Sequence, residues 1–136
     1  MSEPTCDTSV LVPAIASWHE HHELARRGLR DVVALPAHVL FETVSVLSRL
    51  PDPMRISASV VVRALEQLGL PNVELPAAHH LPALHRLAEH GVSGGALYDG
   101  LVATTSSHHG LVLLTLDRRA ERTYAAVGAT YALLQA

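Results

Sequence analysis

Short apolar runs alternate along the chain with longer stretches in which apolar residues recur at helical spacing. The short runs predict β-strands at 4–11, 32–35, 72–75, 111–116 and 129–134, and the longer stretches predict α-helices at 17–29, 37–50, 56–69, 80–90, 95–108 and 118–127. The stronger strand candidates, such as 111–114, are continuously apolar, which is typical of strands covered by helices on both faces. This alternation predicts an α/β fold, a three-layer α/β/α sandwich with a mainly parallel central sheet.

Length and composition narrow this picture to one folded domain. The 136 residues are 49% hydrophobic and 17% charged, so we expect residues 1–136 to form a single domain around one core. No apolar run approaches the roughly 20 residues that span a bilayer. The start of the chain, Met1–Pro4, lacks the basic and apolar regions of a signal peptide. We therefore expect a cytoplasmic protein that does not enter a membrane.

Two absences exclude several kinds of chemistry. All ten basic residues are arginine, which excludes phosphate-binding P-loops, Schiff-base enzymes, kinases and receiver domains, because each of these needs a lysine amine. Cys6 is the single cysteine, which excludes internal disulfides and cysteine-rich zinc sites. The formal net charge of -3 argues against a strongly basic nucleic-acid binder, although a local basic patch stays possible.

Four acidic residues stand in apolar surroundings, where an unpaired carboxylate costs at least several kcal/mol. They are Asp7, Glu42, Asp99 and Asp117. Each alone is explained by a helix cap, a surface position or an ion pair, but the four together favour a shared divalent cation. In a parallel sheet, ligands gather beyond the carboxyl ends of the strands, where these acids are expected to meet. A ligand set made only of oxygen selects Mg²⁺ or Mn²⁺.

The ordered set of acids resembles the PIN domain over essentially the whole chain. The resemblance is carried by Asp7-Thr8-Ser9 after the first strand, Glu42 inside a helix, Asp99-Gly100 near the start of another helix, and Thr115-Leu116-Asp117 at the end of a strand. The length of the chain, together with the stretches 38–42 and 110–117, is most similar to the VapC toxins, the ribonuclease halves of bacterial toxin–antitoxin pairs.

The resemblance implies an endoribonuclease that hydrolyses RNA phosphodiester bonds with Mg²⁺ or Mn²⁺. The catalytic and metal-binding residues would be Asp7, Glu42, Asp99 and Asp117, supported by the hydroxyls of Thr8, Ser9 and Thr115. Without lysine, RNA phosphates would be held by arginine, first by Arg118 and Arg119 and next by Arg26, Arg27 and Arg30. The resemblance also implies a homodimer and inhibition by a cognate antitoxin, a segment of which would occupy the groove near the acids. The apolar stretches of helices 37–50 and 56–69 are candidates for both contact surfaces, although the core also needs apolar residues from them.

Three other functions stay open at this point: a PIN-like binding module without activity, a metal-dependent phosphatase of another α/β family, and a purely structural oligomer. The ten histidines suggest zinc, but His19 to Glu23 departs from the metalloprotease motif HExxH because Glu23 stands where the second histidine is needed. We interpret the histidines as parts of solvated helix faces. We interpret Trp18 as a core or partner contact rather than a platform for a nucleobase.

Overall fold

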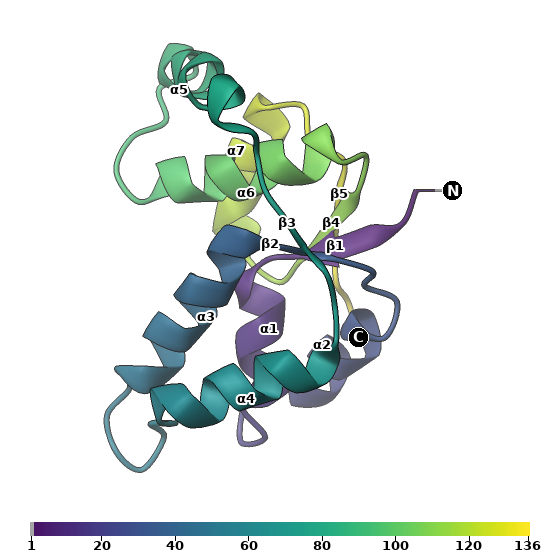
Figure 1. The fold of residues 1–136 in the computed structure, drawn as a ribbon, viewed down its shortest axis with the longest axis vertical. Helices are drawn as coiled ribbons and strands as arrows, with labels where there is room; N and C mark the ends of the chain where they lie inside the picture. The colour runs from purple at the N-terminus through teal and green to yellow at the C-terminus, as the bar shows by residue number, and fades with distance from the viewer. Residues whose placement is uncertain (1) are drawn as a thin grey trace.

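A parallel β-sheet separates two groups of helices in the computed structural model, which describes residues 2–136 (Figure 1). The strands are β1 (Pro4–Cys6), β2 (Leu35–Pro36), β3 (Asn72–Val73), β4 (Val112–Thr115) and β5 (Tyr131–Leu133). The helices are α1 (Thr8–Ile15), α2 (His22–Leu29), α3 (Ala37–Ser48), α4 (Ala58–Leu68), α5 (His80–Glu89), α6 (Ala96–His108) and α7 (Glu121–Ala126). Two 3₁₀ turns, η1 (Ala77–His79) and η2 (Arg118–Ala120), lead into α5 and α7.

The strands run in one direction, so their carboxyl ends lie at one edge. Strands β1, β4 and β5 form a parallel sheet with β4 in the middle, and β2 pairs in parallel with β3. The segment before β2 extends this sheet beside β1, because the Val33 amide donates to the Pro4 carbonyl at 3.0 Å. The Thr5 hydroxyl donates to the Ala34 carbonyl at 2.7 Å on the same side. These contacts place β1 near the centre of the strand arrangement.

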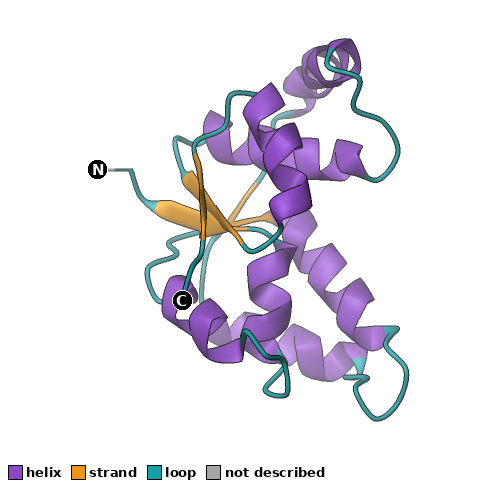
Figure 2. Ribbon diagram, turned by 180° about the vertical axis from the view of Figure 1, so that it is seen from behind, coloured by secondary structure: helices purple, strands orange, loops and turns teal. Residues whose placement is uncertain are grey.

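Helices cover the sheet on both sides and bury its apolar side chains. Helices α5, α6 and α7 lie on one side, and α1, α2, α3 and α4 lie on the other (Figure 2). The main core joins strand residues such as Cys6 and Leu113 to helix residues such as Leu11, Val39 and Val102, all of which are 0–2% exposed. The arrangement confirms the predicted α/β fold with a parallel sheet between helices. No described helix is long and apolar enough to cross a membrane.

The predicted strand at 4–11 is wrong in its second half. The strand ends at Cys6, and Thr8–Ile15 form the helix α1 instead. Asp7 caps this helix: its backbone is extended, and its side chain accepts the amide of Ser9 at 3.0 Å. The run Val10-Leu11-Val12 has β-branched and apolar residues that are typical of a strand, but the cap and the tertiary packing of Val10 and Leu11 outweigh that local preference.

The predicted helix at 17–29 begins later than expected. Helix α2 starts at His22, and residues 16–21 form a loop that joins it to α1. Trp18 lies on this loop and is 46% exposed, so it is not a core residue, and its interpretation as a partner contact stays a prediction. The remaining helices and strands agree with the predictions to within a few residues at their ends, except that residues 32–34 run beside β1 ahead of the short strand β2.

Candidate active site

Four acidic side chains from four different elements line one pocket of about 420 Å³. Asp7 connects β1 to α1, Glu42 lies in the middle of α3, Asp99 lies in the first turn of α6, and Asp117 connects β4 to η2. Asp7 and Asp117 follow neighbouring parallel strands, so the sheet brings them to the same edge. The structure therefore brings together the four acids that the sequence singles out.

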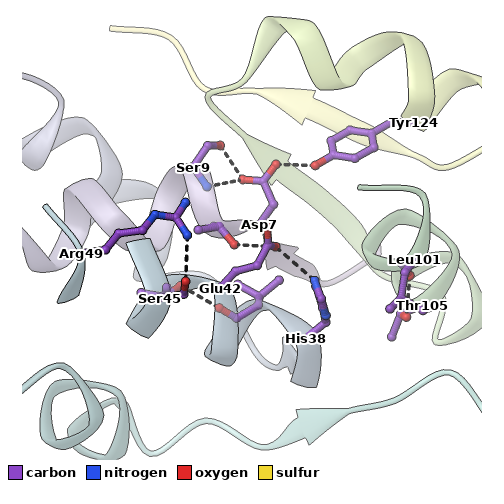
Figure 3. A network of polar contacts seen from close by, with 12 residues as sticks. Asp7, Ser9, His38, Glu42, Ser45, Arg49, Leu101, Thr105 and Tyr124 are labelled. Atoms are coloured by element: carbon purple, nitrogen blue, oxygen red, sulfur yellow. Dashed lines mark hydrogen bonds and ion pairs between the residues drawn. The ribbon is translucent and has the colours of Figure 1, made fainter. Parts of the chain in front are cut away.

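Asp7 is the most deeply placed of the four acids, with only 5% of its surface exposed. One carboxylate oxygen accepts hydrogen bonds from the amide and the hydroxyl of Ser9, and the other accepts the Tyr124 hydroxyl at 2.6 Å (Figure 3). Burial nevertheless raises the pKa of Asp7, because the loss of hydration outweighs these hydrogen bonds, which lower it. Asp7 is thus a desolvated carboxylate whose orientation is fixed from both sides.

Hydroxyl groups tie the end of β4 to the start of α1. The Ser9 hydroxyl lies 3.2 Å from the Thr115 hydroxyl and accepts the amide of Leu116 at 2.8 Å. The Thr115 hydroxyl accepts the amide of Asp117 at 3.0 Å. The hydroxyls predicted to orient carboxylates therefore contact the segments that carry Asp7 and Asp117. Their contribution to activity stays a prediction.

Glu42 is oriented by two neighbours. The Thr8 hydroxyl donates to its Oε1 at 3.0 Å, and His38 Nε2 lies 3.7 Å from the same oxygen, one helical turn earlier on α3 (Figure 3). The His38 ring in turn stacks on Tyr98, with ring centroids 5.2 Å apart and planes inclined by 2°. This chain of contacts links α3 to α6 beside Asp99, and it fixes Glu42 at the rim of the pocket.

Asp99 experiences the combined field of the other three acids. Its carboxyl is half-buried, and burial together with the charges of Glu42, Asp117 and Asp7 raises its pKa to about 6, although Arg119 acts in the opposite direction. Such mutual repulsion shows that the four carboxylates are close enough to interact. Their negative charge favours a cation in the pocket.

Replacing Asp99 with asparagine is expected to stabilise the protein in EDTA by about 1 kcal/mol at pH 7.5, a value reduced for solvent screening. The pKa of Asp99 is higher in the folded protein than its ordinary value of 3.8, so the folded state gains the proton more readily. The cost of ionised Asp99 is therefore absent well below pH 3.8 and complete above about 6. Urea unfolding of wild type and Asp99→Asn, well below pH 3.8 and at pH 7.5, measures how much the substitution changes the free energy of unfolding at each pH. Asp31→Asn, at an exposed acid, is the control and should have no effect.

Gly100 lets α6 pack closely enough to place Asp99 in the pocket. A Cβ atom at this position would lie 2.5 Å from Cδ2 of Leu87, which is 1% exposed on α5. We expect Gly100→Ala to destabilise the protein by about 1–2 kcal/mol, because the overlap outweighs the better helix propensity of alanine. Gly95→Ala is the matched control, since a Cβ there meets no atom within 4 Å, and it should be neutral or stabilising. Thermal unfolding compares the two, and equal melting temperatures would contradict this packing argument.

The two arginines predicted to hold phosphate differ in position. Arg119 lines the pocket, where its amide donates to Asp117 at 2.9 Å and its Nε lies 3.7 Å from the same carboxylate oxygen. Its side chain is 96% exposed, so it can leave Asp117 at little cost. Arg118 is exposed and does not line the pocket, and neither do Arg26, Arg27 and Arg30. Only the prediction for Arg119 has geometric support.

The donor set suits a hard divalent cation. Carboxylate oxygens surround the pocket, and Mg²⁺ and Mn²⁺ prefer oxygen ligands and retain several waters. Among residues 2–136, no three His, Cys, Asp or Glu side chains are close enough together to hold one ion. An ion would thus reach at most two of the acids directly and the others through water.

The sequence analysis missed several residues in or beside the pocket. Tyr124 donates to Asp7 from α7, and His38 approaches Glu42 from the preceding turn of α3. His19 and His21, on the loop after α1, line the pocket as well. The i, i+4 spacing of His38 and Glu42 was a detectable signal. For Tyr124 the sequence offers no local signal, because its role depends on how α7 packs.

The chain is similar in sequence to known proteins. Residues 5–126 match the family model described as the PIN domain. The chain is 48% identical over 119 residues to Ribonuclease VapC40 of Mycobacterium tuberculosis, covering 87% of this chain and 89% of the relative. It is 38% identical over 126 residues to Ribonuclease VapC27 of the same organism, covering 90% of each.

Solved structures share the fold at low sequence identity. The crystal structure of Mycobacterium tuberculosis VapC20, described as a toxin that cleaves the sarcin-ricin loop, has a TM-score of 0.71 at 19% identity and covers 93% of this chain and 95% of that one. The crystal structure of DNA-bound VapBC from Salmonella typhimurium has a TM-score of 0.69 at 21% identity, and the match covers 98% of each chain.

Proposed function

The chain belongs to the PIN-domain family and is a ribonuclease toxin of the VapC type, and from this premise we propose that it hydrolyses RNA with Mg²⁺ or Mn²⁺ at the pocket of the four acids. The observation that carries the proposal is the meeting of Asp7, Glu42, Asp99 and Asp117 from four elements on one pocket, where the other three charges help raise the pKa of Asp99.

The acids, the hydroxyls and Arg119 have separate parts in this proposal. A bound divalent cation supplies a water of lowered pKa and neutralises charge on the phosphate oxygens. Asp7, Glu42, Asp99 and Asp117 would hold it, directly or through water. Ser9 and Thr8 keep Asp7 and Glu42 oriented through their hydrogen bonds. Arg119 offers the pocket a guanidinium that can exchange Asp117 for an RNA phosphate.

A cleavage assay with two substrates tests this function. The protein is incubated with labelled RNA and with a chromogenic phosphomonoester, with Mg²⁺ or Mn²⁺ and with EDTA. We expect the protein to cleave RNA, the cleavage to stop in EDTA, and no chromophore to be released from the monoester. Activity on the monoester alone would favour a phosphatase of another family. Activity on neither would favour a binding module or a structural oligomer.

An antitoxin and a second copy of the chain are the partners that we propose. The support is an apolar groove of about 360 Å³ between α3 and α4, lined by residues that include Leu40, Val44 and Leu65. Phe41 is 83% exposed at this groove, a costly position for a large apolar side chain unless a partner covers it. Gel filtration of the protein, alone and after co-expression with the product of a short reading frame found immediately upstream of its gene, measures both associations. The proposal would be contradicted if the chain eluted as a monomer and did not bind the co-expressed protein.

A further inference from the structure

The pocket of the four acids continues away from them along α1 and α3. Its lining includes Val12 and Pro13 in the second half of α1 and Val46, one turn beyond Glu42 on α3. The two helices lie side by side below the sheet (Figure 1). At 1.5 Å per residue, Val12 is about 7.5 Å further along α1 than Asp7. The pocket therefore has an acidic part near the sheet and an apolar part along the helices.

Aromatic rings line the pocket beside its apolar part. His19 and His21, on the loop that follows α1, line the pocket with ring centroids 5.7 Å apart. The amide of His21 donates to Nδ1 of His19 at 3.0 Å, which restrains the His19 ring. Trp18 lies beside His19 at a centroid distance of 5.9 Å. We refer to Trp18, His19 and His21 as the aromatic ledge.

The charges around the aromatic ledge do not suit a phosphate. Arg119 is the only arginine among the described residues that line the pocket, and it lies beside Asp117. Glu20 lies between His19 and His21 in the sequence, and its carboxylate lies 3.5 Å from His21. Burial, and then the neighbouring His21, lower the pKa of His19, which keeps that ring neutral at neutral pH. Flat rings beside apolar side chains suit the face of another flat ring.

We propose that the aromatic ledge stacks one unpaired nucleobase of a single-stranded RNA whose neighbouring phosphate lies at the four acids. The inference rests on the proposed ribonuclease function and adds a specificity-determining contact to it. Bases in a duplex are covered on both faces, whereas an unpaired base can turn outward and stack on aromatic side chains. The aromatic ledge therefore makes the site selective for unpaired RNA, and its strength varies with the base that stacks.

The single tryptophan of the chain gives this proposal a direct signal. Binding is measured in Ca²⁺ by the fluorescence anisotropy of dye-labelled strands of roughly ten nucleotides, either unstructured RNA or abasic ribose-phosphate of the same length and charge. Trp18 fluorescence reports stacking separately. We expect the wild-type protein to bind RNA about tenfold more tightly than the abasic strand, and only RNA to change the fluorescence. His19→Ala/His21→Ala should remove this preference without weakening binding of the abasic strand, and His19→Phe/His21→Phe should restore it.

A second histidine pair provides the matched control. His79 and His108 have ring centroids 4.8 Å apart and do not line the pocket of the acids. His79→Ala/His108→Ala removes the same number of rings and should leave the preference for RNA over the abasic strand intact. Circular dichroism verifies that all variants fold. If both double alanine variants lost the preference for RNA equally, the role of the aromatic ledge would be overturned.

The outcomes separate the aromatic ledge from the ribonuclease function. If the wild-type protein cleaves RNA in Mn²⁺ and His19→Ala/His21→Ala binds and cleaves as well as wild type, the ledge is overturned and the function stands. If no protein cleaves RNA but His19→Ala/His21→Ala alone loses the preference for RNA over the abasic strand, the role of the aromatic ledge stands and the ribonuclease function fails. If the wild-type protein bound RNA and the abasic strand equally well, the role of the aromatic ledge in RNA binding would be overturned, and a protein partner would be the remaining candidate for this surface.

Discussion

Asp7→Asn is expected to lower RNA cleavage by at least about a hundredfold while the protein stays folded. Asparagine keeps an oxygen that accepts from Ser9, so the cap of α1 survives, and its amide group can donate to the Tyr124 hydroxyl after that hydroxyl rotates. The substitution removes the negative charge that would hold a cation. Initial cleavage rates at saturating Mn²⁺, together with the melting temperature, measure both parts of the expectation.

A distant acid provides the control for this substitution. Asp31 is exposed, follows α2 and does not line the pocket, so Asp31→Asn should cleave RNA at the wild-type rate. Equal activity of the Asp7 variant and wild type would place the reaction at another site. A large loss of stability in the Asp7 variant would instead assign Asp7 a structural role, because the cap tolerates asparagine and the buried charge is unfavourable by itself.

The alternation of strands and helices was predictable because β1 and β4 are apolar runs packed between helices, and most of the longer helices have apolar residues at helical spacing. Helix α6 was predicted within one residue at its start, and α5 within one residue at its end. The segment 7–15 was not predictable in this way. Its apolar run fits a buried strand or a buried helix equally well, and only its position beneath the sheet, with Val10 and Leu11 in the core, selects the helix.

The acidic part of the pocket was predictable for a topological reason. Asp7 and Asp117 follow parallel strands that pair directly, so the sheet forces them to one edge wherever the rest of the chain goes. Tyr124 was not predictable, because it reaches Asp7 across 117 positions of the chain through the packing of α7. The aromatic ledge was hidden for another reason. A helix predicted over residues 17–21 would have pointed His19 and His21 in different directions, whereas the observed loop directs both into the pocket.

Tyr124→Phe is expected to reduce RNA cleavage by about ten- to a hundredfold, although Tyr124 donates to Asp7 from behind and holds no ion itself. Loss of the hydroxyl leaves one oxygen of a buried carboxylate without its donor, so the pKa of Asp7, already raised by burial, rises further. Protons then compete better with the cation. The Mn²⁺ concentration for half-maximal cleavage should therefore increase, and the increase should be larger at pH 6 than at pH 8.

Tyr131→Phe separates this electrostatic effect from a change in packing. The rings of Tyr124 and Tyr131 meet edge to face with centroids 5.8 Å apart, but of these two tyrosines only Tyr124 donates to Asp7. Both substitutions remove one hydroxyl from the same aromatic pair, and only Tyr124→Phe should shift the Mn²⁺ requirement. A parallel shift in both variants would mean that the pair acts by positioning α7 against the sheet. A shift in neither would mean that the Ser9 hydrogen bonds suffice to orient Asp7, which would limit the support of this carboxylate to the start of α1.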